Sequence, residues 1–222
     1  MDVPAKEIIN MLQKANKIYH TTTFELLLAS LVKSVKEETA DEIKVIELES
    51  HGREKICQQE FLSTIGWFTV LYPFSIDYEM IDMESFIIQT KENYRMKLKQ
   101  VKDYAISHEY CKMKKRPFIK FNYLGDIDSK YNNFKLEPNI VYEGRSSNVV
   151  ELDIINRGDV LKIIVKVDTN IWGKEKIKRF VEKFVQNVKA ISYYCQCKKT
   201  KFTPSDFDTV DLSQKDIDEL FI

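Results

Sequence analysis

Residues 24–36 constrain the fold most, because this segment has helical spacing and is apolar on almost every side. Its apolar members are Phe24, Leu26, Leu27, Leu28, Ala29, Leu31, Val32 and Val35. Three threonines, Thr21 to Thr23, precede it and can cap its first turn. A helix that is hydrophobic all round belongs in a core, so other elements must surround it. With 222 residues, the chain is long enough for one large domain or one lobe of a bigger one.

The overall charge is balanced. Lys plus Arg and Asp plus Glu each number 34, which leaves no net field to attract nucleic acid or an anionic membrane. No apolar stretch approaches the roughly 20 residues that span a bilayer, and the first residues do not resemble a signal peptide. We therefore expect a cytoplasmic protein that binds neither nucleic acid nor membrane.

The four cysteines do not have the spacing of a metal site. They are Cys57, Cys111, Cys195 and Cys197, and the last two form a CxC pair that is tighter than the CxxC of zinc or redox sites. In a cytosolic chain, four free thiols are the simplest interpretation. No metal is expected.

Helices and strands are mixed along the rest of the chain. Helical spacing occurs at about 5–19 and, as a strong amphipathic stripe, at about 174–195, while about 83–109 is a polar and broken helical stretch. Strands are predicted at 43–49, 67–72, 118–124, 149–155 and 160–167. The last two flank Asn156 to Asp159, which is typical of a hairpin. Together they predict one α/β domain over residues 1–222, a mixed β-sheet packed with helices.

Proline and glycine give two local expectations. Pro73 cannot donate to a strand ladder, so its strand is an edge strand, has a bulge or ends there. Gly125 is expected to end the strand before it. The acidic C-terminal segment, from Thr203 on, is expected to dock Phe207, Leu212, Leu220 and Phe221 onto the surface.

Glu49 is the most informative polar residue, because it closes an apolar strand just before a turn at Ser50 to Gly52. A carboxylate in this place either pairs or reacts. It could act as a general base, since partial desolvation makes a carboxylate more basic. It could instead form a structural ion pair with Arg53.

Four ordered segments resemble signature motifs of the epimerization domains of nonribosomal peptide synthetases, in the condensation-domain superfamily. Glu49 to Glu54 resembles EGHGRE, Ser63 to Pro73 resembles TVGWFTxxYP, and Phe121 to Gly125 resembles FNYLG. Thr203 to Phe207, TPSDF, falls where such domains usually end. The resemblance covers the whole chain and implies the C-terminal lobe of a domain built from two chloramphenicol-acetyltransferase-like lobes.

The resemblance implies an isomerase that interconverts L and D centres at Cα of an aminoacyl or peptidyl thioester. It implies no directly bound cofactor: the substrate is carried on the phosphopantetheine of a carrier protein, which is the expected partner. Glu49 matches the catalytic carboxylate of the motif. Tyr123 could donate a hydrogen bond to the enolate-like intermediate, or be a core tyrosine. His51, Arg53, Trp67 and Asn122 are expected to support the motifs or line the channel.

The chain also departs from the family pattern. The HHxxxD motif, whose histidine is the second acid/base group, has no counterpart, because the chain's histidines are His20, His51 and His108. We therefore expect the chain to be incomplete alone, and to need an N-terminal lobe or a synthetase partner for activity. Such a lobe would expose apolar surface, so self-association is expected.

Other departures keep two alternatives open. Ser50 and Asp126 replace a glycine and a glutamine of the motifs, and Ser107 to Lys112 lacks the proline and glycines of a PxxGxGYG segment. One alternative is a non-catalytic half-domain that docks a carrier protein or synthetase. The other is the lobe of a condensation domain, which forms peptide bonds.

Overall fold

The computed structural model describes residues 2–4, 6–40, 42–52, 65, 66, 68–101, 117–126, 148–157, 160–207, 210 and 212–221. The chain divides into two compact units. One comprises residues 1–6, 45–75 and 102–178 and contains the sheet, and the other comprises residues 7–44, 76–101 and 179–222 and is helical.

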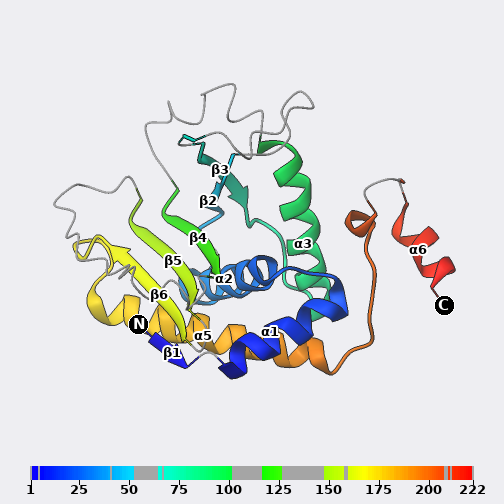
Figure 1. Ribbon diagram of the computed structural model, residues 1–222. Helices are drawn as coiled ribbons and strands as arrows, with labels where there is room; N and C mark the ends of the chain where they lie inside the picture. Colours follow the sequence, from blue (N-terminus) through cyan, green and yellow to red (C-terminus); the bar gives the residue numbers. More distant parts are fainter. Residues whose placement is uncertain are drawn as a thin grey trace. The chain divides into compact units, whose positions relative to one another are not determined.

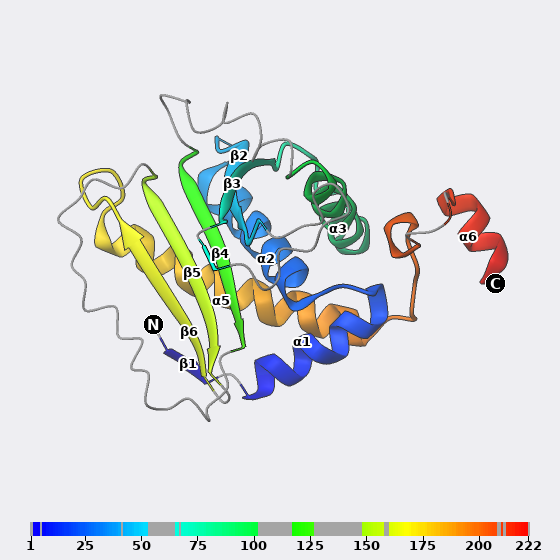
Figure 2. The ribbon, with the colours of Figure 1, turned by 45° about the horizontal axis from the view of Figure 1, so that its top comes forward.

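The sheet unit has a six-stranded mixed sheet in the order β1-β6-β5-β4-β2-β3 (Figure 1). Its strands are β1 (Asp2–Pro4), β2 (Val45–Ser50), β3 (Val70–Ser75), β4 (Ile119–Asp126), β5 (Val150–Arg157) and β6 (Val160–Val167). Strands β2, β4 and β5 are parallel, and the remaining neighbours are antiparallel. Figure 2 shows β4, β5 and β6 lying side by side.

The predicted hairpin is confirmed. Strands β5 and β6 pair continuously from Val150 with Val167 to Arg157 with Val160, the antiparallel register that a short connection produces. The prediction for Pro73 is also confirmed, because β3 is an edge strand and Pro73 lies opposite Glu47 of β2. On an edge, the missing N–H of proline costs no ladder hydrogen bond. Sequence analysis missed β1, which pairs with β6 through only three residues.

The two faces of the sheet differ in polarity. Side chains alternate along a strand, and residues directly opposite across strands share a face. One face is apolar and buried, with Ile46, Leu48, Tyr72, Phe74, Ile119, Phe121, Val150, Leu152, Ile154, Leu161 and Ile163. The other, here called the polar face, carries Glu47, Glu49, Lys120, Asn122, Glu151, Asp153 and Lys166.

The expectation that Gly125 ends its strand is wrong. Strand β4 continues to Asp126, and its pairing with β5 shifts register between Tyr123 and Asp126. Gly125 has φ +79°, a conformation that glycine adopts without strain. Gly125 therefore lies in a β-bulge within the strand and does not end it.

The helical unit contains α1 (Lys6–Tyr19), α2 (Thr23–Thr39), α3 (Met83–Lys99), most of α5 (Lys174–Gln196), the 3-10 helix η3 (Pro204–Asp206) and α6 (Gln214–Leu220). The apolar helix around residues 24–36 is confirmed as α2, whose side chains are buried from Glu25 to Val32. Thr22 caps it through a capping box: its hydroxyl accepts from the Glu25 N–H at 3.2 Å, and the Glu25 carboxylate accepts from the Thr22 N–H at 2.7 Å.

The C-terminal segment follows the expectation only in part. Ile217 of α6 is buried, and the ring of Phe221 stacks on Phe202 with 4.6 Å between centroids, as expected for docking. Leu220 is 66% exposed, so its expected docking is wrong. Among the helices of the described ranges, none is long and apolar enough to cross a membrane.

Candidate functional site

Glu49 lies near the carboxyl end of β2, on the polar face of the sheet. Its side chain is 19% exposed, and its Oε2 lies 3.1 Å from Nζ of Lys120 on the neighbouring parallel strand β4. The register of β2 with β4 places Glu47 opposite Lys120, so the lysine reaches one pleat along the strand to Glu49. From the sequence, Arg53 is the expected partner if Glu49 forms a structural ion pair. Arg53 lies outside the described residues. Among the described residues, Lys120 pairs with Glu49.

The Glu49–Lys120 pair continues into a row of charges across the polar face. Strand β5 places Glu151 directly opposite Lys120 and Asp153 directly opposite Asn122. Lys166 of β6 lies 3.4 Å from Glu151 and 3.9 Å from Asp153, measured from Nζ to the nearest carboxylate oxygen. Carboxylates and ammonium groups therefore alternate across four strands.

The pKa shifts in this row follow from burial and neighbouring charge. Burial by itself would lower the pKa of Lys120, but Glu49, with help from Glu151 and Asp153, outweighs it and raises the pKa. Burial raises the pKa of Asp153, and the two lysines only partly offset this effect. Lys120 thus stays an ammonium ion within a half-buried, carboxylate-rich setting.

The turn after β2 depends on a glycine. Gly52 has φ +63°, and a Cβ built on it would lie 1.7 Å from the carbonyl oxygen of Phe68. No residue with a side chain fits there without moving one of the two backbone segments. The turn therefore brings the segment that follows Glu49 close to the segment that enters β3. His51, also predicted as a supporting residue, is exposed in this turn.

Asn122 and Tyr123 point to opposite faces of β4. Asn122 shares the polar face with Lys120 and Glu49, whereas Tyr123 aligns with Ile154 of the apolar face. The structure therefore brings Asn122, but not Tyr123, onto the face of Glu49. Trp67, a further predicted supporting residue, lies outside the described residues.

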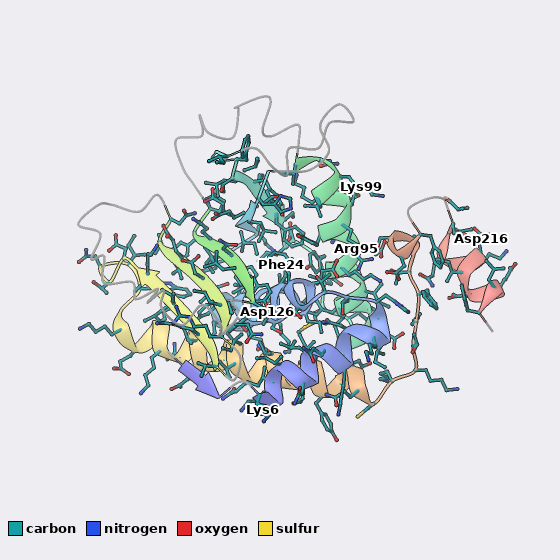
Figure 3. All side chains as sticks on the ribbon, viewed as in Figure 1. Lys6, Phe24, Arg95, Lys99, Asp126 and Asp216 are labelled. Carbon is teal, nitrogen blue, oxygen red and sulfur yellow. The ribbon has the colours of Figure 1, made fainter. Side chains whose placement is uncertain are left out.

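Tyr123 takes part in a separate cluster at the β4 bulge. Its hydroxyl donates to Oδ1 of Asp126 at 3.0 Å, and Nδ2 of Asn156 donates to the same oxygen at 2.5 Å. Burial and the Asp126 carboxylate raise the pKa of the Tyr123 phenol. Figure 3 shows Asp126 at the end of β4. Asp126 stands where the family motif has a glutamine. Because the Tyr123 hydroxyl donates its hydrogen bond to Asp126, it does not offer this hydrogen bond to a substrate.

Sequence reasoning missed Lys120 and the two carboxylates of β5. The signal was present in the alternation of the strands, which places Lys120 and Asn122 on one face and Glu151 and Asp153 on one face. The alternation alone does not show that these side chains meet, because the order of the strands in the sheet depends on long-range contacts. In this sheet, β4 lies between β2 and β5.

A family model matches nearly the whole chain. It is described as "Condensation domain" and matches residues 3–213. Among individual proteins, Gramicidin S synthase 1 of Brevibacillus brevis is 30% identical over 100% of this chain and 22% of its own length. Tyrocidine synthase 2 of Brevibacillus parabrevis is 32% identical over 99% of this chain and 7% of its own length. The chain thus spans less than a quarter of these curated relatives.

Solved structures agree with the fold. The epimerization domain from the third module of tyrocidine synthetase B is 26% identical, with a TM-score of 0.76 over 89% of this chain and 48% of that one. The condensation domain from Monacolin K polyketide synthase has a TM-score of 0.70 at 15% identity, over 87% of this chain and 46% of that one. The second likeness shows the fold alone. Both cover about half of the solved chain, and they confirm the expected α/β class with a mixed sheet.

Proposed function

The chain belongs to the condensation-domain family, and from that premise we propose that it forms part of an epimerization domain of a nonribosomal peptide synthetase. The family resemblance expected from the motifs is confirmed, and the relatives are peptide synthetases. The substrate proposed here is an aminoacyl or peptidyl group held as a thioester on the phosphopantetheine of a carrier protein. The reaction is inversion at its Cα.

One observation carries this proposal: Glu49, the carboxylate of the EGHGRE-like segment, lies near a strand end on a half-buried polar face. The α-proton beside a thioester is weakly acidic, so its removal needs a positioned and partly desolvated base. Glu49 meets both needs, because its side chain is 19% exposed and Lys120 fixes its carboxylate. The likeness to a solved epimerization domain at 26% identity supports inversion over peptide-bond formation.

The proposed reaction has two proton transfers. Glu49 takes the proton from Cα as the C–H bond breaks, and the electron pair moves onto the thioester carbonyl as an enolate. A second acid then protonates Cα from the opposite face. Asn122 shares the polar face with Glu49, and its amide can donate a hydrogen bond to the enolate oxygen.

The second acid has no candidate among the described histidines. The ring of His20 stacks on Phe202 at 4.0 Å between centroids, and His51 is exposed in the turn two residues after Glu49. We assign the second proton transfer to the histidine of an HHxxxD motif on a complementary lobe.

A second candidate function is a non-catalytic half-domain that docks a carrier protein. The ion pair between Glu49 and Lys120 favours it, because a carboxylate that already has a partner can be purely structural. In that case, the chain would bind a carrier protein with the same affinity before and after Glu49 is changed to glutamine.

The test is a stereochemical assay of carrier-bound aminoacyl and dipeptidyl thioesters, incubated with the chain and a separately produced HHxxxD-bearing lobe. Chiral analysis of the released acids should show conversion of L to D toward an equilibrium mixture. Formation of a new peptide bond without inversion would point to a condensation domain. Carrier binding without either reaction would leave the docking half-domain.

A further inference from the structure

Lys120 contacts the proposed base directly. Its Nζ lies 3.1 Å from Glu49 Oε2, and the side chains are 21% and 19% exposed, so solvent screens the pair only in part. An ammonium at this distance favours the ionised form of a carboxylate, and it restricts the carboxylate's rotamers.

The other groups facing Glu49 act in the opposite direction. Glu47 of the same strand, together with Glu151 and Asp153 of β5, adds negative charge to the polar face. The edge strand β3 contributes no charge opposite Glu49, where Leu71 stands. Lys166 of β6 contacts Glu151 and Asp153. Lys120 is therefore the cation in direct contact with Glu49 among the described residues of this face.

The position of Lys120 also suits the movement of charge during proton abstraction. Before the step, the negative charge is on Glu49; afterwards it is on the enolate oxygen, and Glu49 is neutral. A fixed ammonium beside the base can stabilise charge in both states without reorganisation. It can also hold the carboxylate in one orientation throughout.

We propose that Lys120 is the positioning residue that holds the Glu49 carboxylate, through its charge and its direct contact, for abstraction of the α-proton. This inference rests on the proposed function, in which Glu49 is the base. Lys120 acts through Glu49, and it provides an electrostatic arrangement that the four signature motifs of the sequence do not include.

The first test follows the titration of Glu49 itself and needs no catalysis. Carbon-13 carboxylate NMR of the whole chain is recorded against pH, and the Glu49 resonance is assigned by its absence from Glu49→Gln. In Lys120→Met, which removes the ammonium group from the carboxylate, the midpoint of this resonance should move up. Lys120→Arg, which keeps the charge, should restore most of the difference. If Lys120→Met does not fold, Lys120→Gln replaces it.

Lys166→Met is the matched control. Lys166 is on the same face but three strands away in the order β2-β4-β5-β6, or about 14 Å at roughly 4.8 Å per strand. Its removal should shift the Glu49 midpoint by much less than removal of Lys120. Equal midpoints in wild type, Lys120→Met and Lys120→Gln would overturn the inference.

The second test uses the pH profile of Cα proton exchange. Neutralising Lys120 should move the acidic limb of the rate profile to higher pH, and Lys120→Arg should move it back. A rate that falls equally at every pH would mean that Lys120 has only a structural role, which contradicts the inference. If the NMR midpoint shifts but no exchange occurs in any variant, the proposed function fails while the electrostatic role of Lys120 stands.

Discussion

Arg95 of α3, labelled in Figure 3, and Asp206 of η3 are 111 positions apart in the sequence and form an ion pair with 2.7 Å between Nη1 and Oδ1. The same guanidinium donates through Nε to Glu25 of α2 at 2.6 Å and through Nη2 to the carbonyl oxygen of His20 at 2.6 Å. Lys91, one turn earlier on α3, donates to the second oxygen of Asp206 at 2.7 Å. The TPSDF segment is therefore fastened to α3 within the helical unit.

Removal of Arg95 should destabilise the helical unit strongly. Glu25 and Asp206 are only 2% and 7% exposed, and Arg95→Met would leave these two carboxylates without their shared partner. A loss of about 3 kcal/mol in the free energy of unfolding is expected, measured by urea denaturation. The matched control is Arg179→Met: the Arg179 side chain is 64% exposed in its pair with Glu38, so its loss should cost less than about 1 kcal/mol. Equal losses for the two variants would contradict the buried role of Arg95.

The same cluster predicts acid sensitivity. Burial would raise the pKa of Asp206, but Lys91, the Thr203 N–H and Arg95 outweigh it and hold this pKa below the usual range. The stabilisation is therefore fully present above the unfolded aspartate value of about 4, and it is lost as pH falls through the lower folded value.

Asp206→Asn is the variant that tests this dependence. It should be less stable than wild type at pH 7 and should show a shallower loss of unfolding free energy between about pH 4 and pH 2.5. Urea denaturation at several pH values measures both quantities. A slope identical to that of wild type would show that Asp206 does not contribute to acid unfolding.

Two glycines provide a matched test of the turn that follows Glu49. Gly52 and Gly125 both have positive φ, but a Cβ on Gly52 would meet the Phe68 carbonyl oxygen, whereas a Cβ on Gly125 would meet nothing within 4 Å. Gly125→Ala should cost only the backbone strain of about 1–2 kcal/mol. Gly52→Ala should cost more, because the turn must also move. Thermal denaturation of both variants decides this, and an equal cost would argue against the close approach at Gly52.

Asn122 and Tyr123 make a second matched pair. Because Asn122 lies on the face of Glu49 and Tyr123 does not, Asn122→Ala should lower the rate of Cα inversion by about 100-fold, the scale of one lost oxyanion donor. Tyr123→Phe should lower it by less than about tenfold. Inversion rates with saturating carrier-bound substrate measure both. If Tyr123→Phe had the larger effect, the alternative in which Tyr123 donates a hydrogen bond to the enolate would be preferred.

Sequence reasoning succeeded where local pattern decides the structure. The all-apolar helix at 24–36, the amphipathic helix near the end and the hairpin at 149–167 all follow from spacing and turn residues that lie close together in the chain. The choice of Glu49 also rests on a local irregularity, a carboxylate at the end of an apolar strand, and its role stays a prediction.

The rest depended on contacts between distant parts of the chain. The three residues of β1 are too few to show a periodic pattern. The sequence predicts a strand end at Gly125, because the bulge that the structure has there depends on the register with β5. Lys120 could not be assigned to Glu49 without knowing that β4 lies beside β2 in parallel. Likewise, the TPSDF segment was recognised by its letters, but its anchoring by Arg95 is a tertiary property.

The most direct test of the central claim is deuterium wash-in at Cα of carrier-bound aminoacyl thioesters in heavy water. It compares wild type with Glu49→Gln, and with Glu38→Gln of the helical unit as control, each alone and with an HHxxxD-bearing lobe. We predict exchange by wild type and by the control, and at least about 100-fold less by Glu49→Gln. Exchange that persists in Glu49→Gln, or no exchange by wild type in either setting while carrier binding is intact, would contradict the account.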